Sequence, residues 1–183
     1  MNNRGRTGGI LGLEKETIWF LLLVAWMLVI YIQSLIPADL SSEESGIVMT
    51  QILEIMEDIG MDGEGLTEHF VRKSAHFFEY TIFGFLLIQN FRNDWYGSGG
   101  NWKAGRLRKS KGEQYLPVLF AVVMVPFIDE TIQLFVPGRS GQISDVWLDM
   151  TGGGFGILIN TLGIMLLSHI NHSKPRSFRY RRR

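Results

Sequence analysis

Four carboxylates occupy two apolar stretches on either side of a short turn at residues 137–141. Asp129 and Glu130 lie before the turn, and Asp145 and Asp149 lie after it. A charged side chain inside a membrane helix costs about 2.5 to 3.5 kcal/mol on insertion scales, so these groups need partners or a wet cavity. They are therefore the first candidates for a functional site.

An earlier apolar run begins with polar side chains. Lys73, His76 and Tyr80 share one helix face because they are three or four residues apart. Antiparallel packing would place His76 opposite Asp129 or Glu130, so we expect direct or single-water contact with one of them. An imidazole beside a carboxylate can act as general acid and base.

Four apolar runs must position these groups, and each approaches the roughly 20 residues that a membrane helix needs. They are residues 17–36, 74–91, 115–136 and 143–168. The first run could also be interpreted as a signal peptide. It is too long for the apolar region of one, and no small-x-small cleavage site follows it, so we expect a retained helix. Five glycines predict close helix packing in the last run. They are Gly152, Gly153, Gly154, Gly156 and Gly163.

Residues 38–72 form an acidic segment with a single cation, Arg72. Apolar residues recur in it at helical spacing, which predicts an amphipathic helix from about Ser42 to Ile59. Ser41 or Ser42 would cap this helix and Gly60 would end it. We expect a lid that packs on the bundle or lies at the membrane interface, with a partner-binding helix as the alternative.

The charge distribution predicts the orientation. The 183 residues carry no formal net charge. They include no cysteine, which excludes disulfides and thiolate chemistry. Lysine and arginine concentrate before the first run, between the second and third, and after the fourth. The positive-inside rule then places both termini in the cytoplasm of a multi-pass cell-membrane protein. The same cations attract anionic lipids, and we expect no nucleic-acid partner.

These patterns predict an all-α fold, a four-helix transmembrane bundle with an extracytoplasmic amphipathic helix between the first two spans. The bundle covers residues 17–169, with a cytoplasmic tail at 1–16 and a basic cytoplasmic tail at 170–183. This topology brings the intramembrane polar residues to one layer near the extracytoplasmic surface. So many polar groups at one depth favour a site over a purely structural tie that fixes helix register.

Several motifs occur in a defined order over about residues 17 to 168. They are Lys73-x-x-His76-x-x-x-Tyr80-x-x-x-Gly84, Asp129-Glu130-x-x-Gln133, Pro137-Gly138-Arg139, Asp145, and the glycines from Gly152 onward. In these residues the chain resembles the VanZ-like family of small polytopic membrane proteins, with Ser34 similar to a serine near the end of the family's first helix. Asp149 departs from the asparagine expected there. The resemblance implies a link to teicoplanin-type glycopeptide resistance and hence to the Gram-positive cell envelope.

Candidate roles follow for the residues of the polar layer. The candidate catalytic residues are His76, Glu130 and Asp129. The candidate substrate-binding residues are Lys73, Tyr80, Gln133, Arg139, Asp145 and Asp149. We further expect Arg139 and Asp145 to hold the turn together. A metal set could be drawn from His76, Glu79, Asp129 and Glu130, but its spacing is not diagnostic, so no metal and no cofactor are predicted.

Three functional classes remain open. The first acts enzymatically on an envelope lipid or lipid-linked precursor at the outer leaflet, with Lys73 and Arg139 clamping phosphate. The second is a noncatalytic modulator that binds such a lipid or a lipophilic glycopeptide. The third is a small transporter, which the lack of internal repeats disfavours. The sequence does not decide whether the protein is an enzyme, and it leaves the oligomeric state open.

Overall fold

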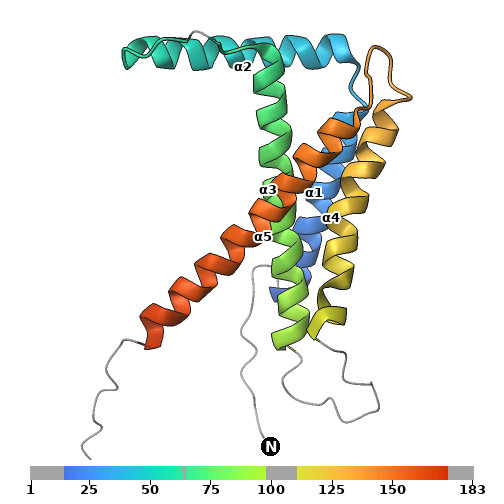
Figure 1. The fold of residues 1–183 in the computed structure, drawn as a ribbon, viewed down its shortest axis with the longest axis vertical. Coiled ribbons are helices and arrows are strands. Elements are labelled where there is room, and N and C mark those ends of the chain that lie inside the picture. The colour runs from blue at the N-terminus through green and yellow to red at the C-terminus, as the bar shows by residue number, and fades with distance from the viewer. Residues whose placement is uncertain (1–14, 64, 98–110, 173–183) are drawn as a thin grey trace, which may run out of the picture.

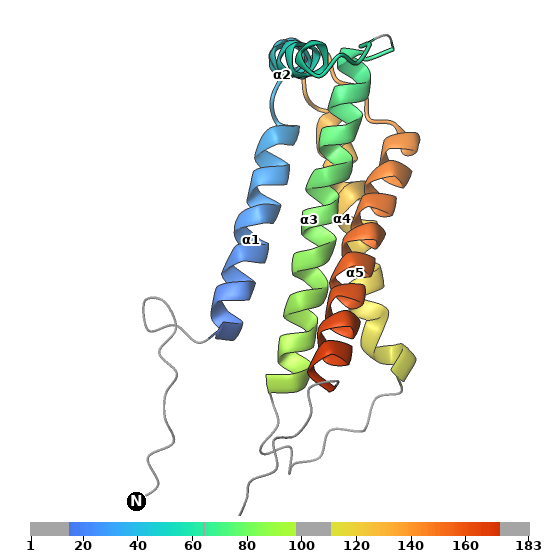
Figure 2. The same ribbon diagram turned by 90° about the vertical axis from the view of Figure 1, so that its left-hand side faces the viewer.

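The computed structural model describes residues 15–63, 65–97 and 111–172. In this part of the chain the regular secondary structure is entirely α-helical. They are α1 (Lys15–Ser34), α2 (Ala38–Asp58), α3 (Glu68–Gly97), α4 (Lys111–Gln133) and α5 (Ile143–His172). Four helices run lengthwise, and α2 lies across one end of them (Figures 1 and 2). The all-α prediction is confirmed. The expectations for the terminal tails and the basic loop fall largely outside the described residues.

Three of these helices are long and apolar enough to cross a membrane. The candidate spans are Thr17–Ser34, Tyr115–Gln133 and Ile143–Ile170, which makes this a multi-pass membrane protein. Helix α3, the second of the four predicted spans, is not among them. It is long enough, but polar residues at both ends of its apolar stretch, such as Glu79 and Asn90, lower its hydropathy.

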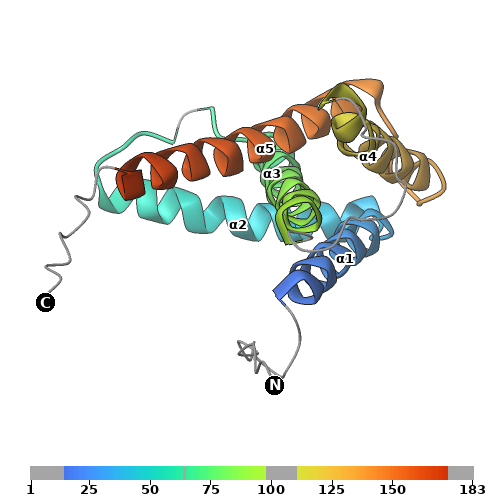
Figure 3. The same cartoon turned by 90° about the horizontal axis from the view of Figure 1, so that it is seen from below.

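Helix α3 is the central helix of the bundle, and it contacts α1, α4 and α5. Seen from below, it lies between these three helices (Figure 3). Its buried residues Tyr80 and Phe83 pack in one core with Leu23 and Ile30 of α1 and Val125 of α4. The helix that is least apolar by sequence is thus the best shielded by its neighbours.

Glycines bring α3 and α5 into backbone contact. A Cβ atom added to Gly84 would collide with the carbonyl group of Gly153, and one added to Gly156 would collide with that of Thr81. A Cβ on Gly152 would lie 2.6 Å from the Phe77 carbonyl oxygen. These contacts confirm the predicted close packing, because only glycine leaves room for it.

The prediction is wrong for two of the five glycines. An added Cβ atom would meet nothing within 4 Å at Gly154 or Gly163. Gly154 lies between Gly153 and Gly156 in sequence but on another face of α5, because adjacent helix residues point about 100° apart. Gly163 comes later in α5, whose second half diverges from the bundle (Figure 1).

Helix α2 begins earlier than the sequence pattern predicted. Pro37 occupies its N-cap with φ −56° and no side chain caps the helix, so the predicted serine cap is wrong. Proline is compatible with the start of a helix because its fixed φ is already helical. The predicted end is confirmed, since Ile59 is the C-cap and Gly60 follows with φ 72°. No residue of α2 is buried.

The other boundaries differ from the predicted spans by a few residues. Helix α4 ends at Gln133, because Pro137 disfavours helix in the residue before it. Gly138 then adopts φ 75°, and the Pro137 carbonyl accepts a hydrogen bond of 3.3 Å from the Ala38 amide. The turn between α4 and α5 is thereby tied to the first residue of α2.

Candidate functional site

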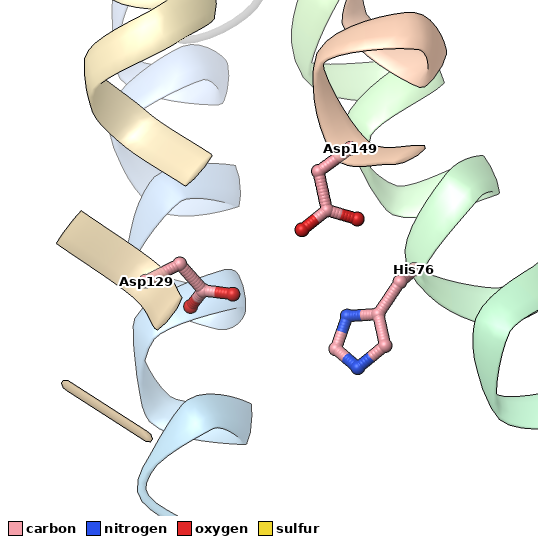
Figure 4. A group of neighbouring side chains, drawn as sticks. All are labelled: His76, Asp129 and Asp149. Carbon is pink, nitrogen blue, oxygen red and sulfur yellow. The ribbon is translucent and has the colours of Figure 1, made fainter. Parts of the chain in front are cut away.

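Most of the buried polar side chains gather near the end of the bundle that α2 covers. His76 of α3, Asp129 of α4 and Asp149 of α5 form an inner group, in which their ligating atoms all lie within 4.8 Å of one another. Figure 4 shows the imidazole and both carboxylates directed toward a common space. Three helices far apart in sequence therefore meet at one polar point.

Asp129 is completely buried and has several polar neighbours. Its Oδ1 accepts a hydrogen bond from the Ser34 hydroxyl of α1, and its Oδ2 lies 3.3 Å from Nε2 of Gln133. Tyr80 is buried close by, and its hydroxyl has no partner of good hydrogen-bond geometry among the described residues. Ser34 and Gln133 thus fix the carboxylate in place.

Asp149 has no such support. It is only 1% exposed, yet neither of its carboxylate oxygens has a hydrogen-bond partner within the described part of the chain. Nδ1 of His76 is likewise buried without one, with its nearest acidic partner, Oε2 of Glu79, 3.6 Å away. The inner group therefore contains buried acceptors without hydrogen bonds, and burying such atoms costs free energy.

Glu130 is directed elsewhere. Its Oε2 accepts a hydrogen bond of 2.9 Å from the Gln142 amide, just before α5, and its Oε1 accepts one of 3.2 Å from Gln133. Of the two predicted partners, the structure thus brings His76 to Asp129, with Asp149 as the third member of the group. Glu130 instead supports the start of α5, because adjacent helix residues point about 100° apart.

The expected pairing of Arg139 with Asp145 is wrong. Nζ of Lys73 lies 2.8 Å from Oδ1 of Asp145, which ties α3 to α5. Arg139 donates instead to two carbonyl groups at the end of α1, from Nε to Ile36 at 2.8 Å and from Nη2 to Gln33 at 3.3 Å. The last carbonyls of a helix lack partners within it, and a cation satisfies them well.

Partial burial affects Arg139 as well. It lowers the pKa of the guanidinium from its usual value, while the negative charge of Asp129 acts in the opposite direction. Arginine stays protonated in proteins, so Arg139 brings a fixed positive charge to this part of the molecule.

A cavity of about 180 Å³ opens above the inner group, beneath the first half of α2. It is lined by Gln33, Ile36, Ser41, Glu44, Ser45, Val48, Val71, Arg72, Ala75, His76, Glu79 and Arg139. The residues from α2 form its roof, which agrees with the expected lid. His76 belongs to both features, so it connects the cavity with the buried carboxylates.

Sequence reasoning missed the part that Arg72 plays. Its Nη2 donates a hydrogen bond of 2.8 Å to the Ser42 hydroxyl of α2, and its Nε is buried without a partner in the described residues. The signal was present, because Arg72, His76 and Glu79 follow at i, i+4 and i+7 and so share one helix face. All three line the cavity.

The arrangement has a definite chemical capacity. Two guanidinium groups and an imidazole at the cavity suit an anion, and His76 and Glu79 can exchange protons there. The predicted substrate-binding residues divide accordingly. Arg139 lines the cavity, Tyr80, Gln133 and Asp149 belong to or adjoin the inner group, and Lys73 and Asp145 form the ion pair.

The fold and this polar group define a polytopic helical membrane protein with buried polar side chains between its helices. The sequence pattern of the VanZ/LLP1 family matches residues 19–166, and the chain belongs to that family. No curated protein and no solved structure matches it.

Proposed function

We propose that the protein binds the anionic headgroup of a cell-envelope lipid or lipid-linked precursor in the cavity beneath α2. The lining of this cavity carries the proposal, since the guanidinium groups of Arg72 and Arg139 can bind phosphate oxygens there, next to the imidazole of His76. Two carboxylates, those of Glu44 and Glu79, also line the cavity. A guanidinium fork matches two phosphate oxygens at once. The volume of about 180 Å³ suits part of a headgroup, so the acyl chains would remain in the membrane.

The membrane arrangement that goes with this proposal has four spans. We take α3 as the fourth, because it is 30 residues long and surrounded by the three apolar helices. The beginnings of α1 and α4 and the ends of α3 and α5 all lie away from α2 (Figures 1 and 2). The chain segments that continue from these ends are rich in lysine and arginine, which favours that side as cytoplasmic.

Helix α2 then lies at the extracytoplasmic interface. Its residues Ile47 and Ile55 are 56% and 61% exposed, and its C-cap Ile59 is 64% exposed. An amphipathic helix of this kind rests at the boundary between headgroups and acyl chains. The cavity would open at the depth of lipid headgroups, and α2 would control access to it.

Both an enzyme and a noncatalytic modulator would bind the headgroup in this cavity. If the protein is an enzyme, His76 would transfer the proton. This residue lines the cavity, and one of its ring nitrogens lies within 4.8 Å of the Asp129 carboxylate. Glu79 would be its partner for proton exchange. The alternative is a noncatalytic binder that sequesters a lipid or a lipophilic glycopeptide, which is the form most directly related to glycopeptide resistance.

Lipid and cell-wall-precursor profiling of cells with and without the protein tests the function. We expect one class of phosphate-containing envelope lipid to change in abundance. The same change should be absent from cells that carry Arg72→Gln. Arg92→Gln is the matched control, because it lies on the same helix about 30 Å away at 1.5 Å per residue.

A second comparison separates the enzyme from the binder. His76→Gln removes proton transfer at similar size, so an enzyme would lose the lipid change while its membrane level stays normal. A binder would keep most of the effect. Identical lipid profiles in cells with and without the protein would contradict the proposal in both forms.

A further inference from the structure

The buried carboxylate of Asp149 is the least satisfied group in the described part of the chain. Both its oxygens lack a hydrogen-bond donor, and the residue is 1% exposed. An ionised carboxylate taken from water without a partner costs far more than a neutral polar group. A proton or a bound cation would stabilise it.

The surroundings of Asp149 favour a cation. Asp129 is 0% exposed and directs a second carboxylate to the same space, and His76 directs its imidazole there as well (Figure 4). Two carboxylates that close together cannot both be ionised in a buried site unless a positive charge lies between them. No lysine or arginine side chain hydrogen-bonds to either of them in the described residues.

The donor set has the chemistry of a metal site. We propose that His76, Asp129 and Asp149 bind one divalent transition-metal ion, with Zn²⁺ and Mn²⁺ as the best matches. Zinc sites that carry out chemistry use three protein ligands from histidine and carboxylate and leave a position open. Mixed imidazole and carboxylate ligands also suit manganese better than calcium or magnesium, which prefer oxygen alone.

The geometry requires only small adjustments. A tetrahedral ion with bonds of about 2.0 to 2.2 Å holds its ligand atoms about 3.4 Å apart. The three ligating atoms lie within 4.8 Å of one another. Side-chain rotations that move each atom by about 1 Å would bring them to the separation that the ion requires. Each ligand comes from a different helix, so the ion would also join α3, α4 and α5.

Neighbouring groups already orient one ligand. Ser34 and Gln133 hydrogen-bond to Asp129, as is usual for a carboxylate that binds a metal. The ion would lie beside the cavity, because His76 lines it. This inference does not depend on the proposed lipid function, since it rests on the inner group alone.

Metal content of the purified protein provides the test. The full chain in detergent, with its affinity tag removed, is stripped with a chelator, incubated with Zn²⁺ or Mn²⁺, desalted and analysed by mass spectrometry. We expect about one ion per chain in the wild type, as for a three-ligand site, and at least tenfold less in Asp149→Asn. Asp145→Asn is the matched control, with the same change one turn earlier on α5, and it should retain the ion.

A second measurement needs no variant. Adding Zn²⁺ or Mn²⁺ to the stripped wild type should raise its Tm, because a ligand that binds only the folded state stabilises it. A wild type that retains no ion and shows no Tm shift would overturn the proposal. Equal metal content in Asp149→Asn and the wild type would do the same. A stripped Asp149→Asn that is more stable than the wild type, with no ion retained by either, would show that the two carboxylates share a proton instead.

Discussion

Nζ of Lys73 on α3 and Oδ1 of Asp145 on α5 lie 2.8 Å apart, and this ion pair links the two helices about one turn before His76 and Asp149. Both helices begin at the end covered by α2 (Figure 1). His76 therefore follows Lys73 at about the depth at which Asp149 follows Asp145. The Lys73–Asp145 ion pair and the polar group one turn deeper therefore both follow from the way α3 and α5 are aligned.

The ion pair should stabilise the protein only modestly. Its side chains are 33% and 26% exposed, and exposed pairs contribute about 0.2 to 1 kcal/mol. A double-mutant cycle with Lys73→Met and Asp145→Asn, measured by unfolding in detergent, should give a coupling energy in that range. Additive effects of the two changes would show that the pair contributes no coupling energy.

The glycine contact between α3 and α5 should tolerate no side chain. Gly156→Ala places a methyl group on the backbone of Thr81, and such overpacking costs about 1 to 3 kcal/mol. We expect a clear drop in Tm in detergent. Gly154→Ala is the control, because it faces open space two residues away and should leave Tm unchanged or raise it. Equal behaviour of the two variants would contradict the backbone contact.

Arg139 should act mainly on the end of α1. Arg139→Lys cannot keep both donations, to Ile36 and to Gln33, because an ammonium group lacks the planar fork. Loss of one charged hydrogen bond should cost about 1.5 kcal/mol or more, seen as a lower Tm. Arg139→Met should cost more still. A stable Arg139→Lys protein would exclude the two-carbonyl role.

The proposed orientation can be tested by single-cysteine labelling. The native chain has no cysteine, so each introduced thiol is unique. Thr50→Cys on α2 and Ser140→Cys in the turn after α4 should react with a membrane-impermeant reagent in intact cells, and Gly100→Cys should react only after lysis. Labelling of position 100 from outside would reverse the assignment.

Sequence patterns were sufficient to predict the helices and to place the candidate site residues near one end of them. Periodicity and length identify each helix, and Gly60 marks the end of α2 because few other residues adopt its positive φ. His76 and Asp129 could be matched because they lie at equal depth on neighbouring helices. These inferences use properties of one helix at a time.

The rotation of each helix about its own axis could not be predicted from such sequence patterns. Asp149 faces His76, and Glu130 faces away, because of how α4 and α5 are rotated in the bundle. That rotation depends on packing among several helices, to which α3 and α5 contribute their glycines. For the same reason Arg139 was assigned to Asp145, which is near in sequence, although its actual partners lie over 100 residues earlier, at and just beyond the C-terminal end of α1.

The contact of α3 and α5 through glycine also bears on the membrane around the protein. Thr81 and Gly84 touch Gly156 and Gly153 below the polar layer, with no flexible side chain between them. Membranes of different thickness make helices tilt, and the cost of mismatch is fractions of a kcal/mol per ångström. Asn160 of α5 still donates a hydrogen bond of 3.1 Å to Oε1 of Gln89 on α3. The last part of α5 diverges from the bundle, so tilting can occur there (Figure 1). The spacing of His76 and Asp149 would then stay constant in thin and thick bilayers alike.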